Sequence, residues 1–250
     1  MSVTIMSIHE ESKHLASESS LARYFGDISV DCPYGLNKEA VYYQARFGSI
    51  REESLDFFLD QGYRRNGNYL YTMHCPECHS CVPIRLPVEE FRPNRSQQRV
   101  MRKNDDISFG MAPLQMSQEN LQLLDKFLDK RFPMCKSNAL SYYSSFFLGN
   151  LTRSFEIRYR LGDELLGVSI VDFSDNWLNA VYFYFDPAEK KRSLGTFNIL
   201  TLINFCQQYD IGKLYLGYWI ENISAMTYKS NFNPHELRLD NNWQKIDKRS

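Results

Sequence analysis

The sequence predicts an α+β protein, with a small N-terminal α+β module followed by a larger α+β domain. Short stretches rich in aromatic and β-branched residues, typical of strands, occur along the whole chain. Three cysteines lie within seven residues at 75–81, and two helical patterns precede three strand patterns in the second half. We therefore expect a cysteine-containing module over 1–108 and a second domain over 109–250.

Composition narrows the class of protein. The chain has 29 basic and 30 acidic side chains, a net charge of -1, so any contact with nucleic acid requires a local basic patch. The first twenty residues lack a basic start followed by an apolar run, and no stretch approaches the roughly 18 apolar residues of a membrane span. We expect a soluble, cytoplasmic protein, monomeric and without a membrane partner.

The first half is predicted to contain short strands and one helix around the cysteines. In chain order these are a turn at 31–37, one or two strands at 40–50, a helix at 50–61, and a turn, a strand, a cysteine knuckle and a further strand at 62–88. Ser49 and Glu52 have the spacing of a capping box, and Gly62 is a helix terminator. The helix is therefore bounded on both sides.

The second half has a more regular order. It predicts helices at 120–132 and 141–149, strands at 155–161, 164–174 and 178–186, a helix at 197–209 and a last strand at 213–220. Gly/Asp and Asp/Asn turns separate the three consecutive strands, which indicates an antiparallel meander. This is the element order of the GNAT acyltransferase fold. Fold does not fix function, but this order favours acyl transfer to an amine.

The cysteines have the spacing of metal ligands. Two consecutive CxxC steps allow thiolates to converge on one ion. The candidate ligands are Cys75, Cys78 and Cys81 with Cys32 as the fourth, and His74 and His79 are alternatives. A structural zinc site or an iron–sulfur cluster would suit these ligands, and the alternative is a free-thiol knuckle that only packs.

A basic segment follows the cysteines. If Asn94 caps a helix, Arg95, Arg99 and Arg102 share one face of it, with Lys103 next to them. Such a face can follow a phosphate backbone, and the alternative is a solvated surface. Its position before an acyltransferase-like half favours RNA.

The segment RSLGTF precedes a predicted helix and resembles an anion-binding loop. Backbone N–H groups of Ser193, Leu194, Gly195 and Thr196 would face the anion at the helix N-terminus. Acetyltransferases place Gly or Ala where this chain has Phe197, which argues against coenzyme A. A packing role for that ring is the alternative.

Several motifs together resemble the bacterial aspartate/glutamate leucyltransferases and, more distantly, the arginyltransferases of the N-degron pathway. The similarity extends from about Cys32 to Trp243. It rests on CPY at 32–34, GYRRNGNYLY at 62–71, CPECHSCVPIRL at 75–86, FRPNRSQQRVMRKN at 91–104, VYFYFDP at 181–187, RSLGTF at 192–197, YLGYWI at 215–220 and MTYKSNFNPHEL at 226–237. The opening motif and ENIS at 221–224 depart from the usual pattern, so both leucyl- and arginyl-tRNA stay open as donors.

The resemblance implies an enzyme that transfers an amino acid from aminoacyl-tRNA to a protein with an N-terminal Asp or Glu, which marks that protein for degradation. The ester is already activated, so no cofactor is required for chemistry. The cations that would bind the acidic acceptor are Arg64, Arg65, Arg85 and Lys229. Candidate catalytic residues are Asp186, Tyr184 and Tyr218. Candidate contacts of the aminoacyl-tRNA are Tyr71, Arg95, Arg99, Arg102, Lys103 and the loop Ser193, Leu194, Gly195, Thr196.

Two other functions are compatible with the same sequence. One is a coenzyme-A-dependent N-acetyltransferase on the GNAT fold, which Phe197 disfavours. The other is a zinc-knuckle RNA-binding protein whose acyltransferase half is inactive.

Overall fold

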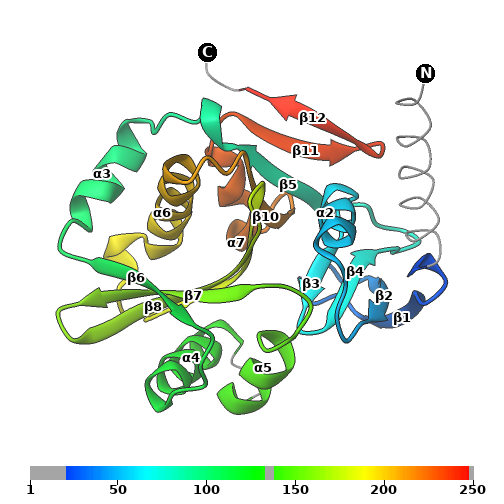
Figure 1. The fold of residues 1–250 in the computed structure, drawn as a ribbon, viewed down its shortest axis with the longest axis horizontal. Coiled ribbons are helices and arrows are strands. Elements are labelled where there is room, and N and C mark those ends of the chain that lie inside the picture. The colour runs from blue at the N-terminus through cyan, green and yellow to red at the C-terminus, as the bar shows by residue number, and fades with distance from the viewer. Residues whose placement is uncertain (1–20, 133–137, 248–250) are drawn as a thin grey trace, which may run out of the picture.

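The computed structural model describes residues 21–132 and 138–247, which form two sheets with helices packed on them (Figure 1). The predicted absence of a leader in residues 1–20 concerns residues outside this part. None of the described helices combines the length and apolarity that crossing a membrane requires.

The smaller sheet is built from the N-terminal module. It has four antiparallel strands in the order β1-β2-β4-β3, with α2 beside them. The elements are β1 (Gly26–Asp31), β2 (Glu39–Arg46), α2 (Glu52–Asp60), β3 (Arg64–Asn66) and β4 (Tyr69–Met73). Leu55 and Leu59 of α2 pack with Leu70 of β4 in a small core.

The larger sheet has eight strands in the order β12-β11-β5-β10-β9-β8-β7-β6. They are β5 (Val82–Pro87), β6 (Ser108–Pro113), β7 (Ser154–Leu161), β8 (Glu164–Phe173), β9 (Trp177–Phe185), β10 (Lys213–Trp219), β11 (His235–Leu239) and β12 (Asn242–Ile246). β9 and β10 are parallel, and the other neighbouring strands are antiparallel.

Helices cover both faces of the larger sheet (Figure 1). They are α3 (Arg95–Lys103), α4 (Gln118–Arg131), α5 (Ala139–Phe146), α6 (Leu194–Gln208) and the short α7 (Ser224–Thr227), with single 3-10 turns at η1 (Val88–Glu90), η2 (Lys190–Arg192) and η3 (Tyr228–Asn231). The main core lies under α6, and a second core joins α4 and α5 to β8 and β9. The order helix, helix, three antiparallel strands, helix, parallel strand confirms the predicted GNAT-like arrangement.

Strand β5 joins the two halves of the chain. It precedes residue 108 in the sequence, yet it lies in the larger sheet between β10 and β11. Its residues Ile84 and Leu86 belong to the same core as Leu178 and Leu202 from the second half. The division at residue 108 stays a prediction, and the two parts share one core.

Strands β9 and β10 separate soon after they pair. Their parallel pairing covers only Trp177–Asn179 and Lys213–Tyr215. β10 then has a bulge between Tyr215 and Gly217, where Gly217 has a φ of 85°. Unpaired backbone carbonyls at such a divergence need other hydrogen-bond donors, and side chains from elsewhere in the chain supply them.

Two details of the predicted elements are wrong. Helix α2 begins at Glu52, and Arg51 is its N-cap residue without a side-chain cap, so Ser49 does not form the predicted capping box. The fully exposed β1 and the hairpin of β11 and β12 were not among the predicted strands.

Candidate functional site

Arg64, from β3, lies at the divergence of β9 and β10. Its guanidinium donates to the Asn179 side-chain oxygen at 2.9 Å and to the Ala180 carbonyl at 3.1 Å. It packs directly on Gly217, where an added Cβ would lie 2.8 Å from the guanidinium carbon. Arg64 is only 8% exposed, and no described carboxylate forms an ion pair with it. A desolvated cation without an anion is costly, which is typical of a site for an anionic ligand.

Lys229, in η3, lies near Arg64. Its ammonium donates to the Tyr218 carbonyl at 2.8 Å and is 3.3 Å from the sulfur of Met226. Burial, aided by the charge of Arg64, lowers the pKa of Lys229 to about 7. No ion pair of Lys229 occurs among the described residues. The site therefore holds a second cation that a carboxylate would stabilise.

Six tyrosines surround these two cations, and we call them the tyrosine cluster. They are Tyr34, Tyr42, Tyr71, Tyr182, Tyr218 and Tyr228. Burial raises the pKa of every one of them, to about 12 for Tyr228. All but Tyr218 are still partly exposed to solvent. These side chains are therefore largely surrounded by protein atoms and yet still reached by solvent.

The cluster brings together distant parts of the chain. Tyr34 from the N-terminal module acts electrostatically on Tyr182 of β9, and the rings of Tyr71 and Tyr218 meet edge to face at 6.3 Å. Arg131 at the end of α4 acts on both Tyr182 and Tyr228. Arg64 and Arg131 thus act on the cluster as cations, while the neighbouring Cys81 thiol acts on Tyr34, Tyr42, Tyr71 and Tyr218 in the opposite direction.

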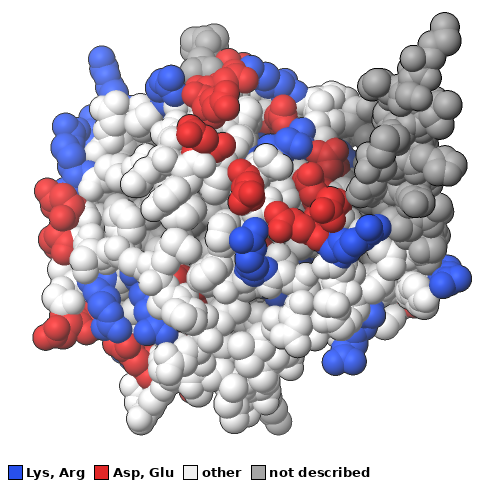
Figure 2. Space-filling model, viewed as in Figure 1, with Lys and Arg blue, Asp and Glu red and all other residues white. Residues whose placement is uncertain are grey.

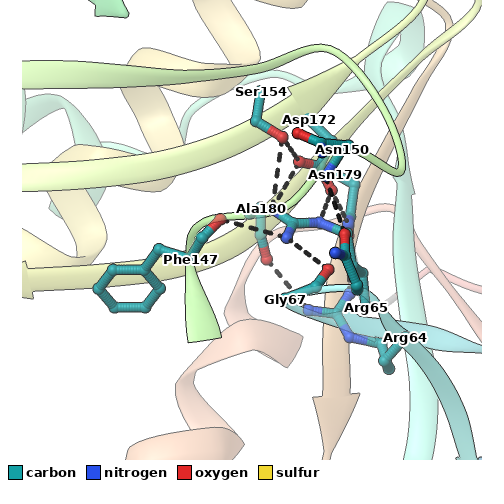
Figure 3. A network of polar contacts seen from close by, with 10 residues as sticks. Arg64, Arg65, Gly67, Phe147, Asn150, Ser154, Asp172, Asn179 and Ala180 are labelled. Carbon is teal, nitrogen blue, oxygen red and sulfur yellow. Dashed lines mark hydrogen bonds and ion pairs between the residues drawn. The ribbon is translucent and has the colours of Figure 1, made fainter. Parts of the chain in front are cut away.

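The other two predicted acceptor-binding cations have internal partners. Arg65 forms a bidentate pair with Asp172 at 2.7 and 2.8 Å, and both side chains are 1% exposed (Figure 3). Arg85 contacts Asp60 and Glu236, each at 2.5 Å, and lies over the ring of Trp243. Arg65 and Arg85 therefore join elements of the fold, whereas Arg64 and Lys229 lie in the cluster.

The predicted catalytic residues do not come together. Tyr218 belongs to the tyrosine cluster, but Tyr184 is fully buried and its ring stacks on Phe147. Asp186 follows β9, accepts the Ala188 backbone N–H at 2.8 Å and pairs with Lys126 at 3.3 Å. These contacts are those of a core residue and a turn-stabilising carboxylate.

The loop 193–196 forms the N-terminus of α6. Ser193 is the N-cap with a φ of 55°, Leu194 is buried, and Gly195 and Thr196 follow in the first turn. A Cβ on Gly195 would lie 3.8 Å from the Tyr228 hydroxyl, so this helix end adjoins the tyrosine cluster. Phe197 packs against Tyr159 in the core, which is the packing role considered from the sequence.

The predicted basic helix is confirmed as α3. Asn94 and Gln97 form a reciprocal capping box, and Arg95, Arg99, Arg102 and Lys103 are all exposed. Lys and Arg side chains gather at the edge of the molecule formed by α3, at the left of Figure 2. The Gln97 side chain donates to the Asn231 carbonyl at 3.2 Å, which ties α3 to the segment that carries Lys229.

Cys32 and the three cysteines of the knuckle are free thiols. Burial raises the pKa of Cys81 to about 12, and Cys75, Cys32 and Cys78 add to the shift, so the four sulfurs are neighbours. The backbone N–H of Val41 donates to the buried Cys75 sulfur at 3.4 Å. Within 21–132 and 138–247, however, no group of three or more His, Cys, Asp or Glu side chains is arranged to hold a metal ion.

Five residues of the site were not among the predicted site residues: Tyr34, Tyr42, Arg131, Asn179 and Tyr228. Tyr34 stands in the CPY motif and Tyr228 in MTYKSNFNPHEL, so both had a signal there, but Tyr42, Arg131 and Asn179 had none of their own. Their places depend on contacts between distant segments, which residue spacing does not display.

An acyltransferase-like sheet with two buried cations and the tyrosine cluster at its parallel strand pair is the arrangement of an acyl-transferring enzyme. Two family models, arginine-tRNA-protein transferase C terminus and N terminus, match residues 119–239 and 30–99. The chain belongs to this family of aminoacyl-tRNA–protein transferases. Aspartate/glutamate leucyltransferase from Methylobacillus flagellatus is 36% identical over 190 residues, which are 75% of this chain and 77% of that protein. The enzyme of the same name from Marinobacter nauticus is 33% identical, over 89% and 95%.

Solved structures show only distant likeness. The C-terminal domain of a putative lysylphosphatidylglycerol synthetase from Agrobacterium fabrum has a TM-score of 0.44 at 11% identity, covering 71% of this chain and 55% of that one. A possible acetyltransferase from Clostridium difficile has a TM-score of 0.37 at 18% identity, covering 50% and 88%. Values this low carry no argument about function.

Proposed function

We propose that the protein transfers an amino acid from aminoacyl-tRNA to the α-amine of proteins that begin with Asp or Glu. The observation that carries this proposal is the pair Arg64 and Lys229, two desolvated cations in the tyrosine cluster that pair with no carboxylate of residues 21–132 and 138–247. The printed name of the relatives, aspartate/glutamate leucyltransferase, supports the same acceptor.

The acceptor carboxylate would bind between Arg64 and Lys229. Arginine grips a carboxylate with two parallel hydrogen bonds, and its planar fork sets the direction of the acceptor. Arg64 is already oriented by Asn179 and Ala180, so little side-chain entropy is lost on binding. Once the side chain is fixed, the α-amine lies a few bonds away, beside the diverging strands.

The chemistry then depends on position. An α-amine has a pKa of about 8, so part of it is uncharged at pH 7 and attacks the activated ester without a covalent enzyme intermediate. The amine nitrogen forms the new amide bond, the ester C–O bond breaks, and the 3′-oxygen of the terminal adenosine leaves with a proton. Tyr71 and Tyr218, with hydroxyls held protonated by burial, are the candidates to donate to the developing oxyanion.

Leucyl-tRNA is the donor we propose. The relatives are named leucyltransferases. Arg64 and Arg131 act on the tyrosine cluster and Arg64 also acts on Lys229, so these like charges would repel the guanidinium of an arginyl donor. Aromatic rings suit an apolar aminoacyl side chain.

The tRNA body would bind along α3. Its exposed arginines offer charge to phosphates, and the Gln97 to Asn231 contact joins this helix to the acceptor site. We propose a monomer that acts in the cytoplasm, where charged tRNA is made. A metal on the cysteines stays a prediction, because no ligand arrangement supports it among the described residues. Metal analysis of protein purified without oxygen tests it, and a metal-free protein contradicts it.

The deciding experiment crosses donors with acceptors. Purified protein is given leucyl- or arginyl-tRNA and peptides that begin with Asp, Glu, Asn or Lys, and transfer of the labelled amino acid is measured. We expect transfer from leucyl-tRNA to the Asp and Glu peptides. Absence of transfer in every combination contradicts the proposed function, and transfer from arginyl-tRNA alone contradicts the proposed donor.

An Arg64→Met variant tests the acceptor site within the same assay. Loss of the charged hydrogen bonds should lower kcat/KM for the Asp peptide by roughly tenfold or more. Arg153→Met is the matched control, because Arg153 is an exposed arginine paired with Glu52. Acetyl-CoA, tested as the donor for the same peptides, is the control for an acetyltransferase.

A further inference from the structure

The neighbouring arginines of β3 lie on either side of a single polar network (Figure 3). Arg65 occupies both carboxylate oxygens of Asp172. The Ser154 hydroxyl also donates to Asp172, at 2.6 Å. Asp172 is therefore fully engaged and, like its partners, removed from solvent.

Asn179 lies between Asp172 and Arg64. Its side-chain nitrogen donates to Asp172 at 3.2 Å, and its side-chain oxygen accepts from Arg64 at 2.9 Å. A carboxylate only accepts and a guanidinium only donates, so the amide orientation is fixed by its two neighbours. Asn179 is 1% exposed, and water cannot replace either contact.

The two arginines therefore differ in whether a carboxylate of the protein neutralises their charge. Arg65 is neutralised by a carboxylate, whereas Arg64 is held by a neutral amide oxygen and by the Ala180 carbonyl. An aspartate at position 179 would place a second carboxylate against Arg64. The guanidinium would then be paired inside the protein before any substrate arrived.

We propose that Asn179 is a specificity-determining, positioning residue, which orients Arg64 through a neutral contact and separates it from Asp172 so that Arg64 binds a substrate carboxylate. This inference rests on the proposed function, and it deepens that function by assigning the selection of acidic acceptors to a residue that does not touch the acceptor.

The test compares two nearly isosteric acceptors, peptides that begin with Asp and with Asn. The readout is the ratio of their kcat/KM values, with leucyl-tRNA as donor at pH 7. Both peptides are measured on one preparation, so the ratio is independent of the fraction of folded enzyme. A merely structural residue would change both values equally and leave the ratio unchanged.

Asn179→Asp should lower the ratio by about tenfold or more, because a charged hydrogen bond to the acceptor is lost. The closeness of the two carboxylates favours protonation of one of them, and the guanidinium groups of Arg64 and Arg65 oppose it. The milder Asn179→Ala, which removes the orienting amide, should lower the ratio by roughly threefold. KM for leucyl-tRNA should stay unchanged in both variants.

Asn198→Asp is the matched control. Asn198 is also buried, at 3% exposed, and accepts from the Tyr159 hydroxyl at 2.8 Å in the core under α6, away from Arg64. The same change of amide to carboxylate there should leave the ratio at the wild-type value.

The outcomes separate the inference from the function. A wild-type ratio in both Asn179 variants overturns the role of Asn179 while the proposed function stands. If Asn179→Asp is inactive, the ratio of kcat/KM values is taken from Asn179→Ala. If both variants are inactive, calorimetry measures their affinities for the Asp and Asn peptides, and the ratio of these affinities is compared with that of the wild type. A wild-type enzyme that does not prefer Asp to Asn overturns the proposed function itself.

Discussion

At the scale of single residues, the site depends on how each cation is neutralised. Arg64 and Arg65 are adjacent in the sequence and both are buried, yet of the two only Arg65 pairs with a carboxylate in the part of the chain that the structure describes. Lys229 pairs with no carboxylate of that part either, and burial next to Arg64 lowers its pKa to about 7. The two kinds of environment predict different consequences of mutation.

Lys229 should make acceptor binding depend on pH. Its pKa of about 7 means that the ammonium loses its proton as the pH rises through 7, and the acceptor carboxylate then loses one of its two cations. We expect KM for an Asp peptide to rise between pH 7 and pH 9 by several fold more in the wild type than in Lys229→Arg, which stays charged. Steady-state kinetics measure KM for both enzymes with the same peptide at each pH, so titration of the peptide amine affects both values equally. Parallel profiles would contradict this role.

The charged form of Lys229, which should strengthen acceptor binding, should weaken the folded state. A lysine whose pKa is depressed on folding binds fewer protons in the folded than in the unfolded state, so it destabilises the fold most at and below pH 7. Lys229→Met should therefore raise the free energy of unfolding at pH 7 by about 1 kcal/mol or more, with the gain shrinking toward pH 10. Urea unfolding at several pH values measures it, and a gain independent of pH would show that the charge is irrelevant.

Arg65 should matter for stability and not for selection of the acceptor. Arg65→Met leaves Asp172 as a buried charge, which costs about 3–5 kcal/mol. In contrast, Arg153→Met breaks an exposed pair with Glu52, worth about 0–1 kcal/mol, and a contact of the guanidinium with the Phe173 ring, worth about 0.5–1 kcal/mol at an exposed site. Urea unfolding of the two variants makes the comparison. An Arg65 variant as stable as the Arg153 variant would be the contrary result.

At the scale of elements, α3 is the part of the protein that would bind tRNA. Reversal of charge at Arg95, Arg99 and Arg102 should raise KM for leucyl-tRNA and flatten its dependence on salt, because fewer counterions are released from the RNA. KM for the acceptor peptide should not change. The same reversal at Arg23, Arg46 and Arg153, which are exposed elsewhere, is the control. An unchanged salt dependence would mean that the α3 face is only solvated.

Local signals explain which elements were predicted correctly. A cap at Asn94 identified α3 in the sequence, and apolar residues at helical spacing identified α4 and α6. Strands β1 and β6 are short and almost entirely exposed, and each has only two large apolar residues, so their sequences carry a weak strand signal. The capping box at Ser49 failed because spacing alone does not show where helical backbone begins.

The candidate site was predictable in its residue types but not in its assembly. The motifs drew attention to Arg64, Lys229, Tyr71 and Tyr218, which lie together, and equally to Arg85, which lies elsewhere. The sequence does not distinguish these arginines from one another. Whether an arginine is available to a substrate depends on whether the fold places a carboxylate next to it.

At the scale of the whole molecule, the two halves depend on each other. The core under α6 includes Val88 and Phe91 as well as β5, all from the first half. We expect residues 109–250 expressed alone to lack a cooperative unfolding transition, and addition of residues 1–108 to restore it. Calorimetry of the fragment, alone and mixed, measures this. A fragment that unfolds cooperatively by itself would show that the division at residue 108 marks an autonomous domain.

The position of β5 also has a consequence for biosynthesis. Its partners are β10 and β11, and β10 begins 126 residues after β5 ends. At about 5–20 residues per second, a ribosome needs roughly 6–25 s to supply the first of these partners. During that interval both edges of β5 are unpaired and its apolar residues have no core, so this strand is where a nascent chain would most need a chaperone. Productive folding of the transferase is thus a late, post-translational event, completed only when the last strands have left the ribosome.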